Sequence, residues 1–384
     1  MTFEFATAGH IIFGRGTVNR IAPKVKEMGT KALLVMGKSI KRVIPLLEQL
    51  KIHRIQYTTF QVHGEPTVEI VEEALAKARS TDVDIVIGFG GGSAIDTGKA
   101  VAALLTNPGN VLDYLEVIGK GRPLIESPLP YIAVPTTAGT GAEVTKNAVL
   151  LSKAHHVKVS LRHQLMIPDL AVVDPELTCS MPPEITASTG LDALTQLIEP
   201  FVSNRANPLT DGICREGLKR ASRSLFKAYQ NGKDIDARED MAVAGLFGGL
   251  ALANAKLGAV HGFAGVLGGM LEAPHGAICA RLLPFVIETN VKALKKDQLN
   301  SSVLERYREL ASLFTDNADA MIEEGPAWIQ SLCDKLNVPT LSEYGMTTDH
   351  TATIVEKAQK ASSMKGNPVE LSVAELTTIL EKAM

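Results

Sequence analysis

The first half of the chain alternates short apolar runs with longer segments of helical periodicity. Such alternation predicts βαβ units around a parallel sheet, and the runs are apolar throughout, as in strands covered on both faces. We expect strands at residues 31–37, 54–60, 84–90 and 129–137, helices near 67–80 and from Ser93, and further β-rich runs at 149–151, 157–161 and 170–173.

The second half of the chain has a different pattern. Beyond Asp174-Pro175 nearly every segment has helical periodicity, and the prolines of MPPEI at 181–185 suit the start of a helix. A length of 384 residues also exceeds the size at which single cores usually stop growing. We therefore predict an α/β domain over residues 1–180 and an all-α domain over 181–384, with a cleft between them as the expected binding site.

One apolar segment, residues 241–270, is long enough to be mistaken for a membrane span. Asn254, Lys256 and His261 interrupt it, so buried helices are favoured over a span. The N-terminal residues do not have the basic and apolar regions of a secretory signal, which predicts a cytoplasmic protein.

The overall composition is that of an ordinary globular protein. A hydrophobic fraction of 45%, a charged fraction of 21% and a net charge of −3 predict small-molecule partners and no nucleic-acid or membrane partner. The four cysteines are scattered without a C-x-x-C pair, so neither a zinc ribbon nor a disulfide framework is indicated, and we expect reduced thiols: Cys179, Cys214, Cys279 and Cys333.

Two glycine-rich segments follow predicted strands. In GFGGGSAIDTGKA (88–100), flexible glycines let backbone N–H groups approach a phosphate at the positive end of the next helix. Ser93 breaks both the P-loop and the G-x-G-x-x-G templates, so a plain strand-to-helix turn is almost as good an interpretation. PTTAGTGAEVT (135–145) is a second loop of this kind, and together the two loops favour a ligand at the carboxyl edge of the sheet.

Four residues of the second half have the chemistry of a metal site. Asp192 and Gln196 are four residues apart, on one face of a helix, and His261 and His275 bracket an apolar stretch. Two imidazoles and a carboxylate suit iron or zinc, whereas the amide oxygen of Gln196 is a weaker donor that either binds the metal or orients a water. The alternative is that each histidine is a structural core residue.

With these motifs in place, the chain resembles the iron-containing (group III) alcohol dehydrogenase family over essentially its whole length. The matching stretches are GGGSAIDTGKA at 90–100, PTTAGTGAEVT at 135–145, VDPELTCSMPP at 173–183, TGLDALTQLIE at 189–199, GAVHG at 258–262, APHGAICARLLP at 273–284 and GNPVELSVAEL at 366–376.

The resemblance implies the dehydroquinate synthase-like fold of this family, in which an α/β dinucleotide domain is followed by a helical domain that holds a divalent metal. It also implies a homodimer. The implied catalytic residues are Asp192, His261 and His275, which with Gln196 are the implied metal ligands. The implied cofactor-binding residues are Gly91, Gly92, Ser93, Thr136, Thr137, Thr140 and Lys158, and Gly37 and Ser39 after the second strand are further candidates. Asp96 is interpreted first as a favourable charge at a helix N-terminus and second as a contact of the substrate or nicotinamide. The implied cofactors are NAD or NADP and a metal, iron(II) first and zinc second, with partial occupancy as an alternative to a full site.

The chain departs from the family pattern at three positions. Gln196 stands where the second metal ligand is usually His. Gly265 stands where a further His is common. Without that His, the general acid is water at the metal, His163 or a ribose hydroxyl of the cofactor. Gly37 replaces an acidic residue of NAD-preferring members, so no carboxylate repels the 2′-phosphate of NADP, and Lys38, Ser39, Lys41 or Arg42 can bind it. The alternative is that Lys41 and Arg42 only solvate the start of a helix.

The resemblance implies an NAD(P)-dependent alcohol dehydrogenase or aldehyde reductase with metal-assisted hydride transfer. One alternative is an oxo-acid reductase similar to maleylacetate reductases, with little dependence on metal and with Arg162 or Arg205 holding the carboxylate. Another is a nucleotide-binding homologue that has lost catalysis through Gln196 and Gly265.

Overall fold

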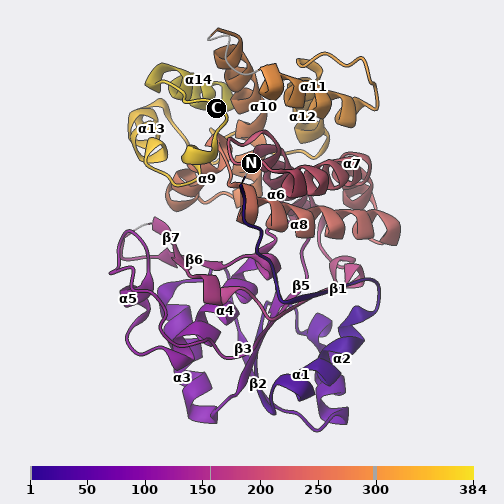
Figure 1. The fold of residues 1–384 in the computed structure, drawn as a ribbon, viewed down its shortest axis with the longest axis vertical. Coiled ribbons are helices and arrows are strands. Elements are labelled where there is room, and N and C mark those ends of the chain that lie inside the picture. Colours follow the sequence, from indigo (N-terminus) through magenta and orange to yellow (C-terminus); the bar gives the residue numbers. More distant parts are fainter. Residues whose placement is uncertain (1, 156, 297–300) are drawn as a thin grey trace. The chain divides into compact units, whose positions relative to one another are not determined.

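The computed structural model describes residues 2–155, 157–296 and 301–384. These residues form two compact units (Figure 1): residues 6–179 form an α/β unit, and residues 180–384 together with residues 2–5 form a helical unit. The predicted division after residue 180 lies one residue from this boundary, but residues 2–5 group with the helical unit instead of the α/β unit.

The α/β unit is built on a six-stranded parallel sheet in the order β1-β8-β5-β4-β2-β3. Its strands are β1 (His10–Phe13), β2 (Lys31–Met36), β3 (Gln56–Gln61), β4 (Ile85–Gly90), β5 (Tyr131–Pro135) and β8 (Leu170–Val173). Its helices are α1 (Ile21–Met28), α2 (Ile40–Ile52), α3 (Val68–Thr81), α4 (Gly92–Thr106) and the single turn α5 (Val111–Tyr114). The parallel α/β architecture confirms the predicted fold class.

Two predicted β-rich runs, 149–151 and 157–161, do not join this sheet. They lie in β6 (Asn147–Ser152) and β7 (Val157–Arg162), which pair antiparallel as a separate two-stranded sheet. The edge strand β1, by contrast, was not predicted.

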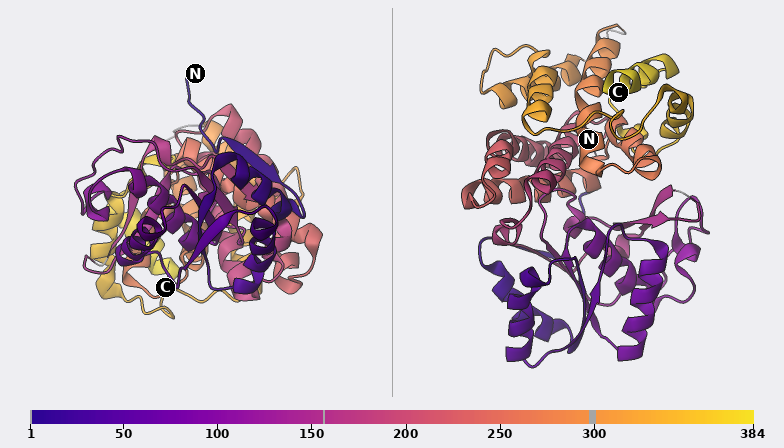
Figure 2. Two further views of the ribbon diagram at one scale, coloured as in Figure 1. Left: turned by 90° about the horizontal axis from the view of Figure 1, so that it is seen from below. Right: turned by 180° about the vertical axis from the view of Figure 1, so that it is seen from behind.

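Side chains of the central sheet alternate between two hydrophobic layers, as the period of two in a strand requires. Leu33 and Val35 of β2 pack in the layer that includes α3 and α4. Leu34 and Met36 pack in the opposite layer with α1 and α2. Because both faces are covered by helices (Figure 2), the inner strands β4, β5 and β8 are buried along their whole length, whereas the edge strand β3 keeps polar residues.

The chain changes direction across the sheet between β2 and β4. It passes from β2 to the edge strand β3, returns to β4 on the other side of β2, and continues to β5. In open parallel sheets such a switch point forms a crevice at the carboxyl ends of the strands, where ligands bind. The two glycine-rich loops follow β4 and β5, so both start at this edge.

The helical unit contains α6 (Pro183–Val202), α7 (Pro208–Gln230), α8 (Ile235–Ala255), α9 (Ala259–Met270), α10 (His275–Lys296), α11 (Ser301–Thr315), α12 (Glu324–Lys335), α13 (Thr351–Gln359) and α14 (Val373–Ala383). The α6 helix is its centre, since it packs against α7, α8 and α10 and is almost wholly buried after Thr189. Within the described residues, no single helix has the length and apolarity to cross a bilayer; α8 and α9 meet those criteria only together, and the chain bends by 104° between them.

Candidate metal centre and nucleotide loops

Four ligand-type side chains of the helical unit meet at one point. Asp192 comes from α6, His261 from α9, and His275 and Cys279 from α10, and one donor atom of each lies within 4.8 Å of the others. Asp192 Oδ1 is 3.4 Å from His261 Nε2 and 3.9 Å from His275 Nε2. The structure therefore brings together the three residues predicted to be catalytic, and adds a thiol that was not predicted.

The close approach of α10 to α6 depends on Gly276. A Cβ at this position would lie 1.8 Å from the backbone oxygen of Ser188 and 3.1 Å from Cβ of Asp192. Only a residue without a side chain fits such a contact. Because His275 precedes this glycine, the same contact brings its imidazole to Asp192.

Gln196 lies one helical turn after Asp192 and is also buried. Its Nε2 donates a hydrogen bond of 3.0 Å to Asp192 Oδ2. The amide oxygen, which has no hydrogen-bond partner among the described residues, lies against Gly248 of α8, where a Cβ would be 3.3 Å away. In this arrangement Gln196 orients the carboxylate of Asp192.

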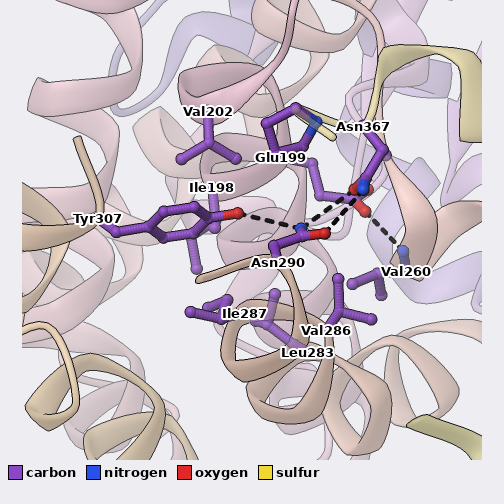
Figure 3. Close-up of a pocket in the computed structure, with 12 residues that line it drawn as sticks. Ile198, Glu199, Val202, Val260, Leu283, Val286, Ile287, Asn290, Tyr307 and Asn367 are labelled. Atoms are coloured by element: carbon purple, nitrogen blue, oxygen red, sulfur yellow. Dashed lines mark hydrogen bonds between the residues drawn. The ribbon is translucent and has the colours of Figure 1, made fainter. Parts of the chain in front are cut away.

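Glu199, a further turn along α6, fixes the orientation of His261. Its Oε2 is 2.6 Å from His261 Nδ1, and its Oε1 accepts a hydrogen bond of 2.7 Å from the backbone N–H of Val260 (Figure 3). A carboxylate on one ring nitrogen selects the tautomer whose other nitrogen has a free lone pair. His261 Nε2 is thus the nitrogen whose lone pair is available to a metal, and it faces Asp192.

The start of α9 is also held by the C-terminal segment. Asn367 Oδ1 accepts a hydrogen bond of 3.2 Å from Ala259 N, and its amide exchanges hydrogen bonds with Asn290, whose Nδ2 also donates to the hydroxyl of Tyr307 (Figure 3). A Cβ at Gly258 would lie 2.9 Å from Glu199 Oε1. The GAVHG and GNP motifs therefore meet, and together they position His261.

The electrostatics of the cluster favour negative charge at Asp192 and Cys279 and positive charge at the two imidazoles. Asp192 Oδ1 is buried and accepts no hydrogen bond from any described residue. Burial acts to raise the pKa of Asp192, but the two imidazoles bring it below its ordinary value. Burial likewise opposes the charged forms of His261 and Cys279. Cys279, Glu199 and Asp192 nevertheless raise the pKa of His261, and His275 and His261 lower the pKa of the Cys279 thiol. The cluster thus stabilises charge at its donor atoms.

In the α/β unit, the first glycine loop links β4 to α4. A Cβ at Gly90 would lie 2.6 Å from Cβ of Ala94 and 3.1 Å from the backbone nitrogen of Gly37. Gly91 is the N-cap of α4, with Gly92 and Ser93 in its first turn. The loop thus leaves open backbone N–H groups at the positive end of a 15-residue helix.

The second loop lies against the first. A Cβ at Gly91 would be 3.3 Å from Thr137 Cγ2, and a Cβ at Gly92 would be 3.1 Å from Thr140 Cγ2. Thr136 N donates to Gly90 O at 2.9 Å, and Thr136 Oγ1 accepts from Arg42 Nη1 at 3.4 Å. The structure therefore gathers the predicted glycines and threonines at one edge, with Gly37 beside them and the exposed Ser39 at the N-cap of α2.

Three charged groups are buried beneath these loops. Lys99 Nζ donates to Ala142 O and Asn147 O and lies 3.9 Å from Asp96 Oδ1. Burial raises the pKa of Asp96 to about 6 and of Glu143 to about 7, and lowers the pKa of Lys99 to about 8. Asp96 Oδ2 accepts a hydrogen bond from Val149 N of β6, so this carboxylate joins α4 to the hairpin.

Lys158, predicted to contact the ribose region, lies on β7, with its Nζ 3.1 Å from Glu65 Oε1. Its contact with a cofactor stays a prediction.

Sequence reasoning missed Cys279, Glu199 and Asn367. For the first two a signal existed, since Cys279 follows His275 by four residues and Glu199 follows Asp192 by seven, which are the spacings of one helix face. No local pattern links Asn367 to Ala259, which is 108 residues away.

A parallel sheet with paired glycine loops at its carboxyl edge, together with a carboxylate and imidazole cluster in a helical unit, is typical of metal-assisted, dinucleotide-dependent oxidoreductases. Residues 8–175 match the family described as iron-containing alcohol dehydrogenase, and residues 186–384 match the C-terminal domain of the Fe-containing alcohol dehydrogenase family. The chain belongs to the iron-containing alcohol dehydrogenase family.

Individual relatives match over nearly the whole chain. Long-chain-alcohol dehydrogenase 1 of Geobacillus thermodenitrificans is 34% identical, over 99% of this chain and 95% of the relative. The crystal structure of a 1,3-propanediol oxidoreductase is 30% identical with a TM-score of 0.93 and full coverage of both chains. A sulfoacetaldehyde reductase from Bifidobacterium kashiwanohense, in complex with NAD+, is 26% identical with a TM-score of 0.88, over 100% of this chain and 99% of that one. The chain is thus an oxidoreductase that acts on CH–OH groups.

Proposed function

We propose that the protein interconverts small-molecule alcohols and aldehydes, with NAD(P) as the hydride carrier and a divalent metal held by Asp192, His261 and His275. The observation that carries this proposal is the buried Asp192 Oδ1, which lies between two imidazole Nε2 atoms and accepts no hydrogen bond from the described residues.

The residues present fit a metal. An unsatisfied buried acceptor costs about 1–3 kcal/mol, and more when it is charged. A cation between the carboxylate and the imidazoles removes this penalty, and two imidazoles with one carboxylate are a donor set that suits iron(II) or zinc. When bound, the metal supplies a Lewis acid that polarises the oxygen of the substrate.

The chain itself supplies orientation at this centre. Glu199 holds His261 Nδ1 and so directs Nε2 toward Asp192, while Gln196 holds the second oxygen of Asp192. Gly276 permits the contact between α6 and α10 that brings His275 to the cluster. These partners hold the donors in place before a metal arrives, which lowers the reorganisation that binding requires.

The α/β unit fits a dinucleotide. The glycine loop leaves its backbone N–H groups open at the start of α4, where a pyrophosphate is stabilised, and a side chain at Gly90 would clash with Ala94. When bound, the nicotinamide supplies or accepts the hydride. Two sets of groups would hold and orient the dinucleotide. They are the backbone of Gly91 and Gly92 and the hydroxyls of Thr137 and Thr140.

The direct test is turnover of short aldehydes with NADH, before and after treatment with a chelator. We expect chelation to lower the rate by at least about tenfold, since a Lewis acid contributes several kcal/mol to transition-state stabilisation, and we expect iron(II) or zinc to restore the rate. An oxo-acid is the comparison substrate. Three results would contradict the proposal. The first is full activity in protein that elemental analysis shows to be metal-free. The others are turnover of the oxo-acid alone and tight dinucleotide binding without turnover of any substrate.

We propose further that NADPH is accepted as well as NADH. The residue after β2 is Gly37, which places no carboxylate against a 2′-phosphate, and Arg42 Nη1 lies 3.4 Å from Thr136 Oγ1. Because β4 lies between β2 and β5, this guanidinium reaches from α2, which follows β2, to the loop that follows β5.

Arg42→Ala is expected to reduce kcat/KM with NADPH by about 10–100-fold, since a hydrogen bond to a charged group contributes about 1.5–3 kcal/mol, and to change kcat/KM with NADH by less than about threefold. Lys51→Ala, at the exposed opposite end of α2, is the matched control. Equal losses with both cofactors, or a wild-type preference for NADH above about a hundredfold, would remove the basis for NADPH binding by Arg42.

We also propose that the protein is a homodimer, which the resemblance to the family supports, and that it is cytoplasmic.

A further inference from the structure

Cys279 is the one member of the cluster that neither the predicted ligand set nor the proposed function uses. Its Sγ lies 3.8 Å from His275 Nε2 and 3.9 Å from His261 Nε2, and its side chain is fully buried. It follows His275 by one helical turn on α10, so both side chains project from the same face of that helix.

Gln196 occupies the position of a lost imidazole but is committed to another contact. Its Nε2 donates to Asp192 Oδ2, and turning the amide over would place two acceptor oxygens against each other. The amide oxygen is therefore held on the far side, against Gly248. The cluster has lost an imidazole on α6 and contains a thiol on α10.

We propose that Cys279 is the fourth protein ligand of the divalent metal and compensates for the imidazole that is missing at Gln196, which acts as a positioning residue for Asp192. The proposal rests on the proposed metal-assisted function. Two observations carry it: Sγ lies among three donors within 4.8 Å of one another, and the buried Asp192 Oδ1 that faces this group accepts no hydrogen bond from the described chain.

Binding by the thiol changes the chemistry of the centre. The thiol loses its proton to solvent as the sulfur–metal bond forms, so no oxidant or reductant is required. A thiolate is a softer donor than the imidazole it replaces, and a set of Cys, two His and Asp is typical of zinc. We therefore expect this chain to prefer zinc over iron(II) more strongly than a variant in which the imidazole is restored and the thiol removed.

Substitution with cobalt(II) tests the ligand directly, because it gives a readout independent of activity. A cobalt–thiolate bond produces a charge-transfer band in the near ultraviolet, whereas the visible d–d bands report bound cobalt whatever the ligands are. We expect both in the wild-type protein. In Cys279→Ser we expect the charge-transfer band to disappear and cobalt affinity to fall by at least about a hundredfold, since loss of a second-shell partner alone costs 10–100-fold.

Cys333→Ser is the matched control, because Cys333 is equally buried in the helical unit and contacts Ala280 of α10; both bands should remain. The double variant Gln196→His/Cys279→Ser should regain cobalt affinity without the charge-transfer band. Elemental analysis should show a lower ratio of bound zinc to bound iron in this variant than in the wild type. d–d bands without a charge-transfer band in the wild type would overturn the role of Cys279 and leave the proposed function intact. A wild type that binds no cobalt, iron or zinc would overturn both.

Discussion

Asp192→Asn is expected to lower kcat for aldehyde reduction by about a thousandfold. The substitution keeps an oxygen that can accept from Gln196, but it removes the negative charge that faces both imidazoles and can place an amide N–H where the cation belongs. A Lewis acid contributes several kcal/mol to transition-state stabilisation, and each 1.36 kcal/mol corresponds to about tenfold in rate. Steady-state kinetics with NADH, together with metal analysis of the purified variant, measure both losses.

Asp319→Asn, an exposed position of the same unit, controls for the change of charge and should leave both quantities unaltered. The cofactor provides a second control, since the glycine loop is untouched and NADH should bind the Asp192 variant with unchanged affinity. An Asp192 variant that retains its metal, or more than about a tenth of the wild-type rate, would contradict the assignment of Asp192 as a ligand.

Gly276→Ala is expected to destabilise the helical unit by about 3 kcal/mol or more, because overpacking of a tight contact costs about 1–3 kcal/mol even where neighbours can move, and here the neighbour is backbone. The added methyl would lie 1.8 Å from Ser188 O and must push α10 away from α6. The displacement also separates His275 and Cys279 from Asp192, so we expect metal loss even where the variant folds. Thermal unfolding and metal analysis are the measurements.

Gly265→Ala provides the matched control on α9. Within the described part of the chain, no heavy atom outside the local helix backbone lies within 4 Å of a Cβ at position 265. Alanine in a helix is about 0.5–1 kcal/mol more favourable than glycine, so this variant should be as stable as the wild type or more stable. If Gly276→Ala were as stable as the wild type and retained its metal, the close contact between α6 and α10 would not be what brings His275 to Asp192.

The layered α/β architecture was predictable because its signals are local. Each central strand is an unbroken apolar run, such as residues 85–90, followed by a segment of helical periodicity. β1 lacks this context, since HIIF is only four residues long and lies between glycines. The β6–β7 hairpin has strong strand propensity, but only tertiary pairing decides which sheet a strand joins.

The candidate site was predictable where spacing and residue type coincide. Asp192, His261 and His275 are recognisable in the sequence because carboxylate and imidazole are familiar ligands, whereas Cys279 has no C-x-x-C partner to mark it as one. The function of Gln196 could not be read from its residue type, since an amide either donates or accepts. Only the geometry, with Nε2 toward Asp192, distinguishes the two roles.

The dependence of His261 on Asn367 has a consequence for biosynthesis. The six strands of the parallel sheet are complete once residue 173 has been translated, so the α/β unit can fold on the ribosome while the helices are still being made. The start of α9, by contrast, receives the amide of Asn367 only when translation of the 384 residues is almost finished. We therefore expect the nascent chain to complete its nucleotide-binding edge well before Asn367 can position His261, and we expect metal binding to follow release from the ribosome.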